Sequence, residues 1–154
     1  MIEKALPLLL VAALAAPVAA QSKTAAPAKK EAAERITVYR SRTCGCCGKW
    51  VQHLKDNGFE VAEHIVEQID NAPGRDRVPE KLRSCHIAKI RTYVVEGHVP
   101  ADVVKDMLKK RPEIEGIAVP GMPQGSPGME SPTPQPYEVI AWTKAGKSWT
   151  FARR

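Results

Sequence analysis

The 154-residue sequence lacks an internal repeat, a dense block of basic residues and a second long hydrophobic run. A chain of this length has room for one sizeable core, so we expect a single folded domain. The 23 Lys and Arg residues outnumber the 17 Asp and Glu residues only mildly, giving a net charge of +6. Because 26% of the residues are charged, an ordinary fraction, the composition also argues against a wholly disordered chain.

The one long apolar run lies at the N-terminus. Lys4 precedes an apolar core at residues 6–16, and small residues at 18–20 precede Gln21. This pattern predicts a secretory signal peptide over residues 1–20. The alternative is a transmembrane anchor, but the run contains two prolines and is shorter than the ~20 residues that span a bilayer. We therefore expect cleavage, and no membrane insertion of the mature chain. Export also argues against nucleic acid as a partner of the basic excess.

The composition changes after the apolar run. Residues 21–34 contain no large apolar side chain, which predicts a flexible linker before a folded domain at 35–154. Hydrophobic periodicity then predicts strands at 36–39, 59–66 and 90–96, helices at 49–57 and 100–111, helical turns at 79–84, and a C-terminal hairpin from 137–142 and 148–151. This order is typical of an α/β protein. The expected fold is a thioredoxin-like layered sheet, with a cysteine turn at the N-terminus of the first helix.

Cysteine is scarce but concentrated. Cys44, Cys46 and Cys47 fall within four positions, and Cys85 lies far downstream beside a histidine. The triplet superposes a Cys-x-x-Cys spacing on a Cys-x-Cys spacing, and its glycines let the backbone turn the sulfur atoms toward one point. The positive end of the following helix would favour thiolate over thiol.

Three interpretations of the cysteines are open. Two structural disulfides would need one bond inside the triplet, where the closed ring is too small to contribute much stability. A thiol–disulfide oxidoreductase would attack with Cys44 and resolve with Cys47, but Cys46 would compete with the resolving step. Copper(I) suits the cluster best, because one sulfur atom can bridge two copper(I) ions and adjacent cysteines can therefore share several ions. A single tetrahedral zinc ion does not easily accommodate adjacent cysteines.

Methionine and histidine supply further candidate ligands. Met122 and Met129 lie in a Pro/Gly-rich loop at 120–136, and neutral thioethers select copper(I). His98 is expected in a turn at the end of a strand, and His86 is adjacent to the fourth cysteine. The alternative to a role in metal binding is that these methionines and histidines are simply exposed to solvent. His53 is expected on the surface of the first helix.

Four motifs follow one another along the chain. They are TCGCCGKW at 43–50, LRSCH at 82–86, VEGHVPA at 95–101 and GMPQGSPGM at 121–129. Together they resemble a family of exported bacterial metal-binding proteins, long described as a domain of unknown function, that includes a copper-resistance protein, CopG. The resemblance spans residues 36–154. It implies a thioredoxin-like fold, a periplasmic location, and copper binding through Cys44, Cys46, Cys47 and Cys85.

The sequence thus predicts a periplasmic copper-binding protein that acts in copper resistance or homeostasis. The sequence predicts a site for one or several copper(I) ions. Its expected ligands are Cys44, Cys46, Cys47, Cys85, Met122, His98, Met129 and His86. The expected partners are copper ions and a periplasmic protein that donates or accepts them. The methionine loop would be a lid that excludes water and slows oxidation. Copper redox activity is compatible with this role, and a thioredoxin-like oxidoreductase is the alternative.

Overall fold

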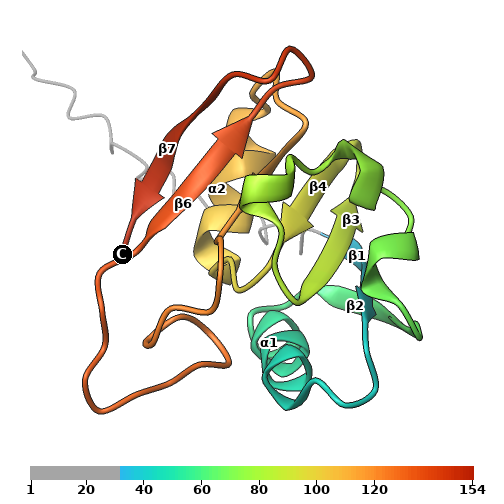
Figure 1. Cartoon of the computed structure of the whole chain (residues 1–154), viewed down its shortest axis with the longest axis vertical. Coiled ribbons are helices and arrows are strands. Elements are labelled where there is room, and N and C mark those ends of the chain that lie inside the picture. The colour runs from blue at the N-terminus through green and yellow to red at the C-terminus, as the bar shows by residue number, and fades with distance from the viewer. Residues whose placement is uncertain (1–31) are drawn as a thin grey trace, which may run out of the picture. The chain divides into compact units, whose positions relative to one another are not determined.

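The computed structural model describes residues 32–154. The predicted signal peptide at residues 1–20 and most of the predicted linker at 21–34 lie outside the described residues. Within residues 32–154, no helix is both long enough and apolar enough to cross a membrane. This part of the chain combines one mixed sheet with two α-helices (Figure 1), so the predicted α/β class is confirmed.

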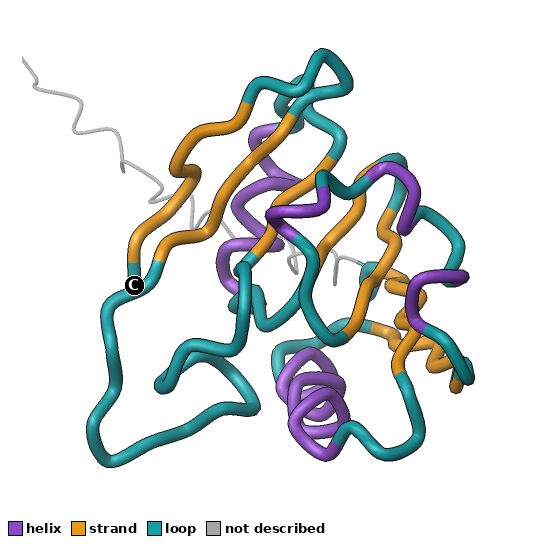
Figure 2. The backbone as a smooth tube through the Cα atoms, viewed as in Figure 1, coloured by secondary structure: helices purple, strands orange, loops and turns teal. Residues whose placement is uncertain are grey.

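The sheet has seven strands in the order β2-β1-β3-β4-β5-β6-β7. They are β1 (Arg35–Arg40), β2 (Glu60–Ile65), β3 (His86–Ile90), β4 (Tyr93–Glu96), β5 (Gly116–Ala118), β6 (Glu138–Trp142) and β7 (Ser148–Arg153). The β1–β2 and β4–β5 pairs are parallel and the other pairs are antiparallel. The pair β6–β7 forms the C-terminal hairpin, and a long loop without helix or strand connects β5 to β6 (Figure 2).

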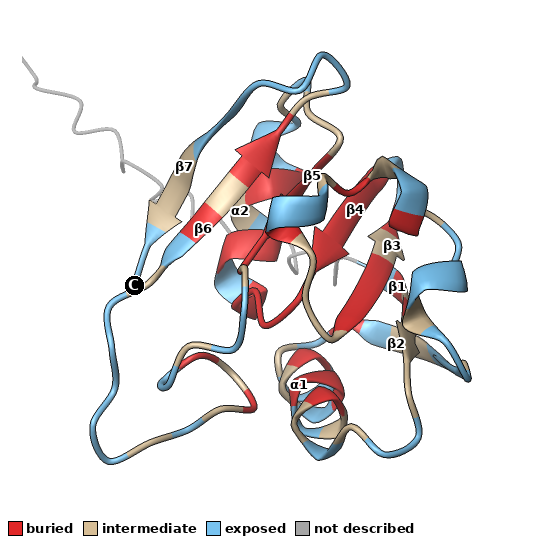
Figure 3. Cartoon of the chain, in the orientation of Figure 1, coloured by how far each residue is buried: buried red, intermediate tan, exposed pale blue. Residues whose placement is uncertain are grey.

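Two α-helices cover one face of this sheet. Helix α1 (Gly45–Asp56) and helix α2 (Ala101–Lys110) each bury one apolar stripe. These stripes pack on alternate strand residues such as Ala88, Val95 and Ile117 in the larger core cluster. The neighbouring residues on each strand point to the opposite face, where short 3-10 turns between residues 69 and 82 cover them. Buried side chains therefore concentrate in the central strands (Figure 3).

Two predicted boundaries were wrong, and both concern cysteines. One strand was expected at 90–96, but the structure has β3 and β4 joined by Arg91-Thr92. The sequence carries no Gly, Asn or Asp to announce this turn, and Arg91 adopts a φ of +52° that non-glycine residues rarely take. Helix α1 begins at Gly45 rather than at residue 49. Cys85 therefore immediately precedes a strand, Cys44 is the N-cap of α1, and Cys46 and Cys47 lie in its first turn.

Trp50 joins α1 to the rest of the core and gives a first prediction. Its side chain is fully buried, and its indole N–H donates to the Val99 carbonyl at 2.8 Å. Trp50→Ala should lower the free energy of unfolding by about 3–5 kcal/mol, because a large cavity opens. Urea unfolding measures this loss. Trp149→Ala is the control: Trp149 is 44% exposed, so about 0.5 kcal/mol is expected. Equal losses in both variants would contradict this account of the core.

Candidate metal centre

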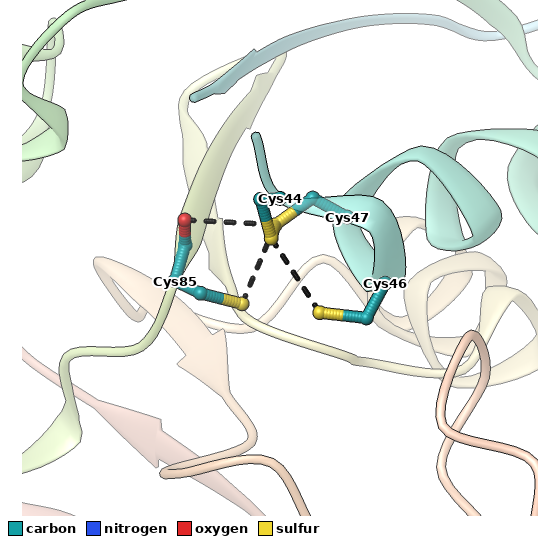
Figure 4. A group of neighbouring side chains, drawn as sticks. All are labelled: Cys44, Cys46, Cys47 and Cys85. Carbon is teal, nitrogen blue, oxygen red and sulfur yellow. Dashed lines mark hydrogen bonds between the residues drawn. A yellow bond between two sulfur atoms is a disulfide. The ribbon is translucent and has the colours of Figure 1, made fainter. Parts of the chain in front are cut away.

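The sheet register brings the four cysteines together. Strand β1 leads into Cys44, and its last residue, Arg40, pairs with His86, the first residue of β3. Cys85, the residue directly before β3, therefore lies beside the first turn of α1. The Cys47 and Cys85 sulfur atoms lie 3.5 Å apart (Figure 4). All four cysteine sulfur atoms lie within 4.8 Å of one another.

The four sulfur atoms are not in one redox state. Cys44 and Cys47 form a disulfide, whereas Cys46 and Cys85 are free thiols. The sulfur of Cys46 lies 3.4 Å from that of Cys44. One disulfide beside two free thiols differs from the two-disulfide interpretation. Thiolate ligands at all four positions require reduction of the Cys44–Cys47 bond.

Cys85 also faces two buried imidazoles. Its sulfur lies 3.3 Å from His98 Nε2 and 3.4 Å from His86 Nδ1, and these three side chains form a second group with metal-ligand spacing. His98 Nδ1 lies 2.8 Å from the Pro127 carbonyl. Since a carbonyl oxygen only accepts hydrogen bonds, Nδ1 carries the proton in the neutral ring. The lone pair of His98 is therefore on Nε2, facing Cys85 as a metal ligand would.

Burial sets the protonation of these groups. It lowers the pKa of His98, and together with the neighbouring His98 ring it lowers the pKa of His86 to about 3. Both imidazoles are therefore neutral near pH 7, the form that binds metals. Burial, followed by the nearby Cys46 sulfur, raises the pKa of Cys85 to about 11. A soft cation at this position would displace the thiol proton and offset the repulsion between sulfur atoms.

The two candidate methionines lie in different environments. Met129 lines a cavity of about 450 Å³ together with Cys46 and Lys49 from α1. Met122, the other expected methionine ligand, is 52% exposed. The cavity therefore brings Met129 near Cys46, one of the two free cysteines of the cluster.

Gly128 allows the methionine loop to pack on α1. Its φ is +87°, and an added Cβ would lie 2.6 Å from the Cys46 carbonyl oxygen. Gly128→Ala should therefore lift the loop and cost roughly 1–3 kcal/mol of stability, measured by urea unfolding. Gly121→Ala isolates the clash, because Gly121 has a similar φ of +70° with open space around its Cβ. Equal costs in the two variants would show that the loop does not need this close approach.

Sequence reasoning misplaced His53. Rather than lying free on the helix surface, its Nε2 accepts a hydrogen bond from the backbone N–H of Ala101 at 3.0 Å, at the start of α2. The sequence patterns also did not indicate a role for Arg75 and Glu96, which form a buried ion pair close to Cys85. A lone Glu among apolar strand residues was the signal for Glu96. No local pattern indicated Arg75.

Comparisons with known proteins identify the family of this chain. Residues 82–129 match the family described as "Protein of unknown function, DUF411". Two solved structures of copper resistance protein CopG, forms 2 and 1, resemble the chain with TM-scores of 0.74 and 0.73. Each is 40% identical and covers 79% of this chain and 98% of its own. No curated protein matches. The chain therefore belongs to the DUF411 family that includes copper resistance protein CopG.

Proposed function

We propose that this protein binds copper(I) in the periplasm and acts in copper resistance or homeostasis. The observation that carries the proposal is the convergence of four cysteine sulfur atoms within 4.8 Å, from two distant segments of the chain. The name of the related copper resistance proteins supports the choice of metal. Thiolate sulfur is the ligand that copper(I) prefers, and one sulfur can bridge two ions.

The donor set favours more than one ion. Four cysteine sulfur atoms and two imidazoles meet at Cys85, which belongs to both groups with metal-ligand spacing. One tetrahedral zinc uses four ligands and would leave donors unused. We propose Cys44, Cys46, Cys47 and Cys85 as thiolate ligands after reduction, with His98 Nε2 and His86 Nδ1 completing the site. Bound copper(I) would supply the positive charge that keeps these sulfur atoms together.

A copper(I) titration of the reduced protein against a competing chelator tests the proposal. We expect more than one copper(I) per chain, and zinc should not displace it. A single equivalent of tightly bound zinc that copper(I) cannot displace would contradict the proposal. It would favour a zinc-binding role instead.

Location and fold complete the proposal. The signal-peptide pattern at 1–20 and the linker composition at 21–34 support export of a domain at 35–154. Cell fractionation should recover a shortened chain from the periplasm, whereas a full-length chain in the membrane fraction would contradict export. The order β2-β1-β3-β4, with α1 between β1 and β2 and α2 after β4, supports the thioredoxin-like assignment.

A role in copper resistance or homeostasis also requires a partner. We propose that this partner is a periplasmic protein that donates copper or accepts it.

A second candidate function is thiol–disulfide exchange. The Cys44–Cys47 disulfide at the start of α1 is the bond that such an enzyme would use. Against it, the Cys46 and Cys85 thiols lie within reach of the same sulfur atoms and would compete for the mixed disulfide. Insulin reduction at thioredoxin-like rates by the metal-free protein would favour the second candidate. Slow reduction beside tight copper(I) binding favours the first.

The cavity beside Cys46 leads to a prediction about the methionine loop. If Met129 shields the cluster, Met129→Ala should speed air oxidation of the bound copper(I) several-fold, because water and oxygen gain access through the enlarged cavity. Loss of copper(I) after exposure to air measures the rate. Met122→Ala, at an exposed position of the same loop, is the matched control and should have the smaller effect. Unchanged rates in both variants would remove the lid from the account.

A further inference from the structure

Two charged side chains are buried behind the segment that carries Cys85. Arg75 lies in the 3-10 turn Arg75–Arg77 and is 4% exposed, and Glu96 ends β4 and is fully buried. Arg75 Nη1 donates a hydrogen bond to Glu96 Oε1. A buried ion pair adds little net stability, because desolvation of both charges offsets their attraction. The hydrogen bonds that the two side chains make to neighbouring residues therefore matter more than the contribution of the ion pair to stability.

Both members of this pair hold the residue before Cys85. Glu96 Oε1 accepts a hydrogen bond from the Ser84 backbone N–H at 2.5 Å, and Arg75 Nη2 donates to the Ser84 carbonyl at 3.0 Å. The Ser84 hydroxyl donates to the Gly121 carbonyl at 2.7 Å, which ties the same residue to the methionine loop. Every polar group of Ser84 is thus fixed, and the backbone at Cys85 has little freedom to move.

The same carboxylate adjoins the turn that carries His98. Glu96 lies two residues before His98, and the intervening Gly97 donates its N–H to the His86 carbonyl at 3.0 Å. An added Cβ at Gly97 would lie 2.8 Å from Ser84 Cβ, so the two segments approach as closely as glycine allows. The Cys85 and His98 segments are therefore held against each other beside the buried pair.

Resting on the proposed copper(I) site, we infer that Arg75 and Glu96 are positioning residues that hold Cys85 where its sulfur can share copper with the cysteine triplet and His98. Within residues 32–154, neither side chain forms a hydrogen bond with a cysteine sulfur atom. They act through the Ser84 backbone instead. Residues that orient metal ligands in this way typically contribute about 10–100-fold to metal affinity.

The chain supplies a matched control in the same turn. Arg77 also pairs with a glutamate, Glu115, at 2.7 Å, and also donates to a backbone carbonyl, that of Thr92 at 2.8 Å. This second pair is partly exposed and holds no residue next to a cysteine. A general effect of losing an Arg–Glu pair should appear in both places. A positioning effect should appear only at Glu96.

The experiment compares Glu96→Ala, Glu96→Gln and Glu115→Ala by two readouts. The first is the alkylation rate of Cys85 relative to Cys46 with the Cys44–Cys47 disulfide intact, mapped by mass spectrometry. The second is copper(I) affinity of the reduced protein in chelator competition. Glu96→Ala should raise the alkylation ratio and weaken copper(I) binding about 10–100-fold. Glu96→Gln keeps an acceptor oxygen, and Arg75 keeps Asp70 as an anionic partner, so both readouts should stay near the original. Glu115→Ala should change neither.

Equal results for Glu96→Ala and Glu115→Ala, or weaker copper(I) binding without faster Cys85 alkylation, would overturn the inference. If Glu96→Ala does not fold, Arg75→Lys replaces it: the charge remains but the fork that also reaches Ser84 is lost, and the same two shifts are expected in smaller size. A folded Arg75→Lys variant without either shift would overturn the inference. If the original protein binds no copper(I), the proposed function fails, and the alkylation ratio alone decides whether the pair positions Cys85.

Discussion

Replacing Cys85 by serine is expected to abolish multinuclear copper(I) binding. Cys85 is the only residue common to the cysteine group and the cysteine–histidine group, so its loss breaks both. We expect affinity to fall by more than the roughly 10–100-fold typical of residues that only support a ligand. Chelator competition of the reduced protein gives both affinity and stoichiometry.

A histidine outside the cluster provides the control. His64 on β2 stacks on Tyr39 with ring centroids 5.2 Å apart and is exposed. His64→Gln should leave the copper(I) stoichiometry unchanged. Full stoichiometry in Cys85→Ser would contradict the shared role of Cys85. It would leave the triplet as a site of its own.

Oxidation of Cys44 and Cys47 is expected to remove most copper(I) capacity. Their disulfide occupies two of the four sulfur atoms, and only thiolates are strong ligands for the metal. Two electrons and two protons convert the bond to two thiols, and copper(I) then displaces the thiol protons. Titrating matched oxidised and reduced samples, with thiols counted in each, measures the difference.

Reversal is the control for this result. A sample that is oxidised and then reduced again should regain the copper(I) stoichiometry of the untreated protein. If the oxidised protein already binds the full amount, Cys44 and Cys47 are not ligands. The site would then be confined to Cys46, Cys85 and the two histidines.

Much of the fold could be predicted because its signals are local. The stripes of α1 and α2 follow helical spacing, and the hairpin β6–β7 follows alternation around a short turn. The β3–β4 turn could not be predicted, because its geometry depends on Arg91 adopting a positive φ. That residue is held by tertiary contacts with Glu34 and with the carbonyl of Leu108. Such contacts leave no trace in a sequence window.

The site divides in the same way. The triplet was evident from spacing alone, whereas the approach of Cys85 depends on the β1–β3 register, which pairs residues far apart in the chain. Burial of His98 and the Pro127 carbonyl that orients it are likewise products of tertiary packing. Arg75 lies in a polar loop, where an arginine is ordinarily exposed. Only the fold shows that it is buried beside Glu96 and bonded to Ser84.

X-ray absorption at the copper edge of the reduced, copper(I)-loaded protein tests the central claim most directly. If the sulfur atoms of Cys44, Cys46, Cys47 and Cys85 share copper, the nearest neighbours of the metal are mainly sulfur, with a smaller nitrogen contribution and a copper–copper scattering shell. Coordination by nitrogen and oxygen alone, without a copper neighbour, would contradict the account.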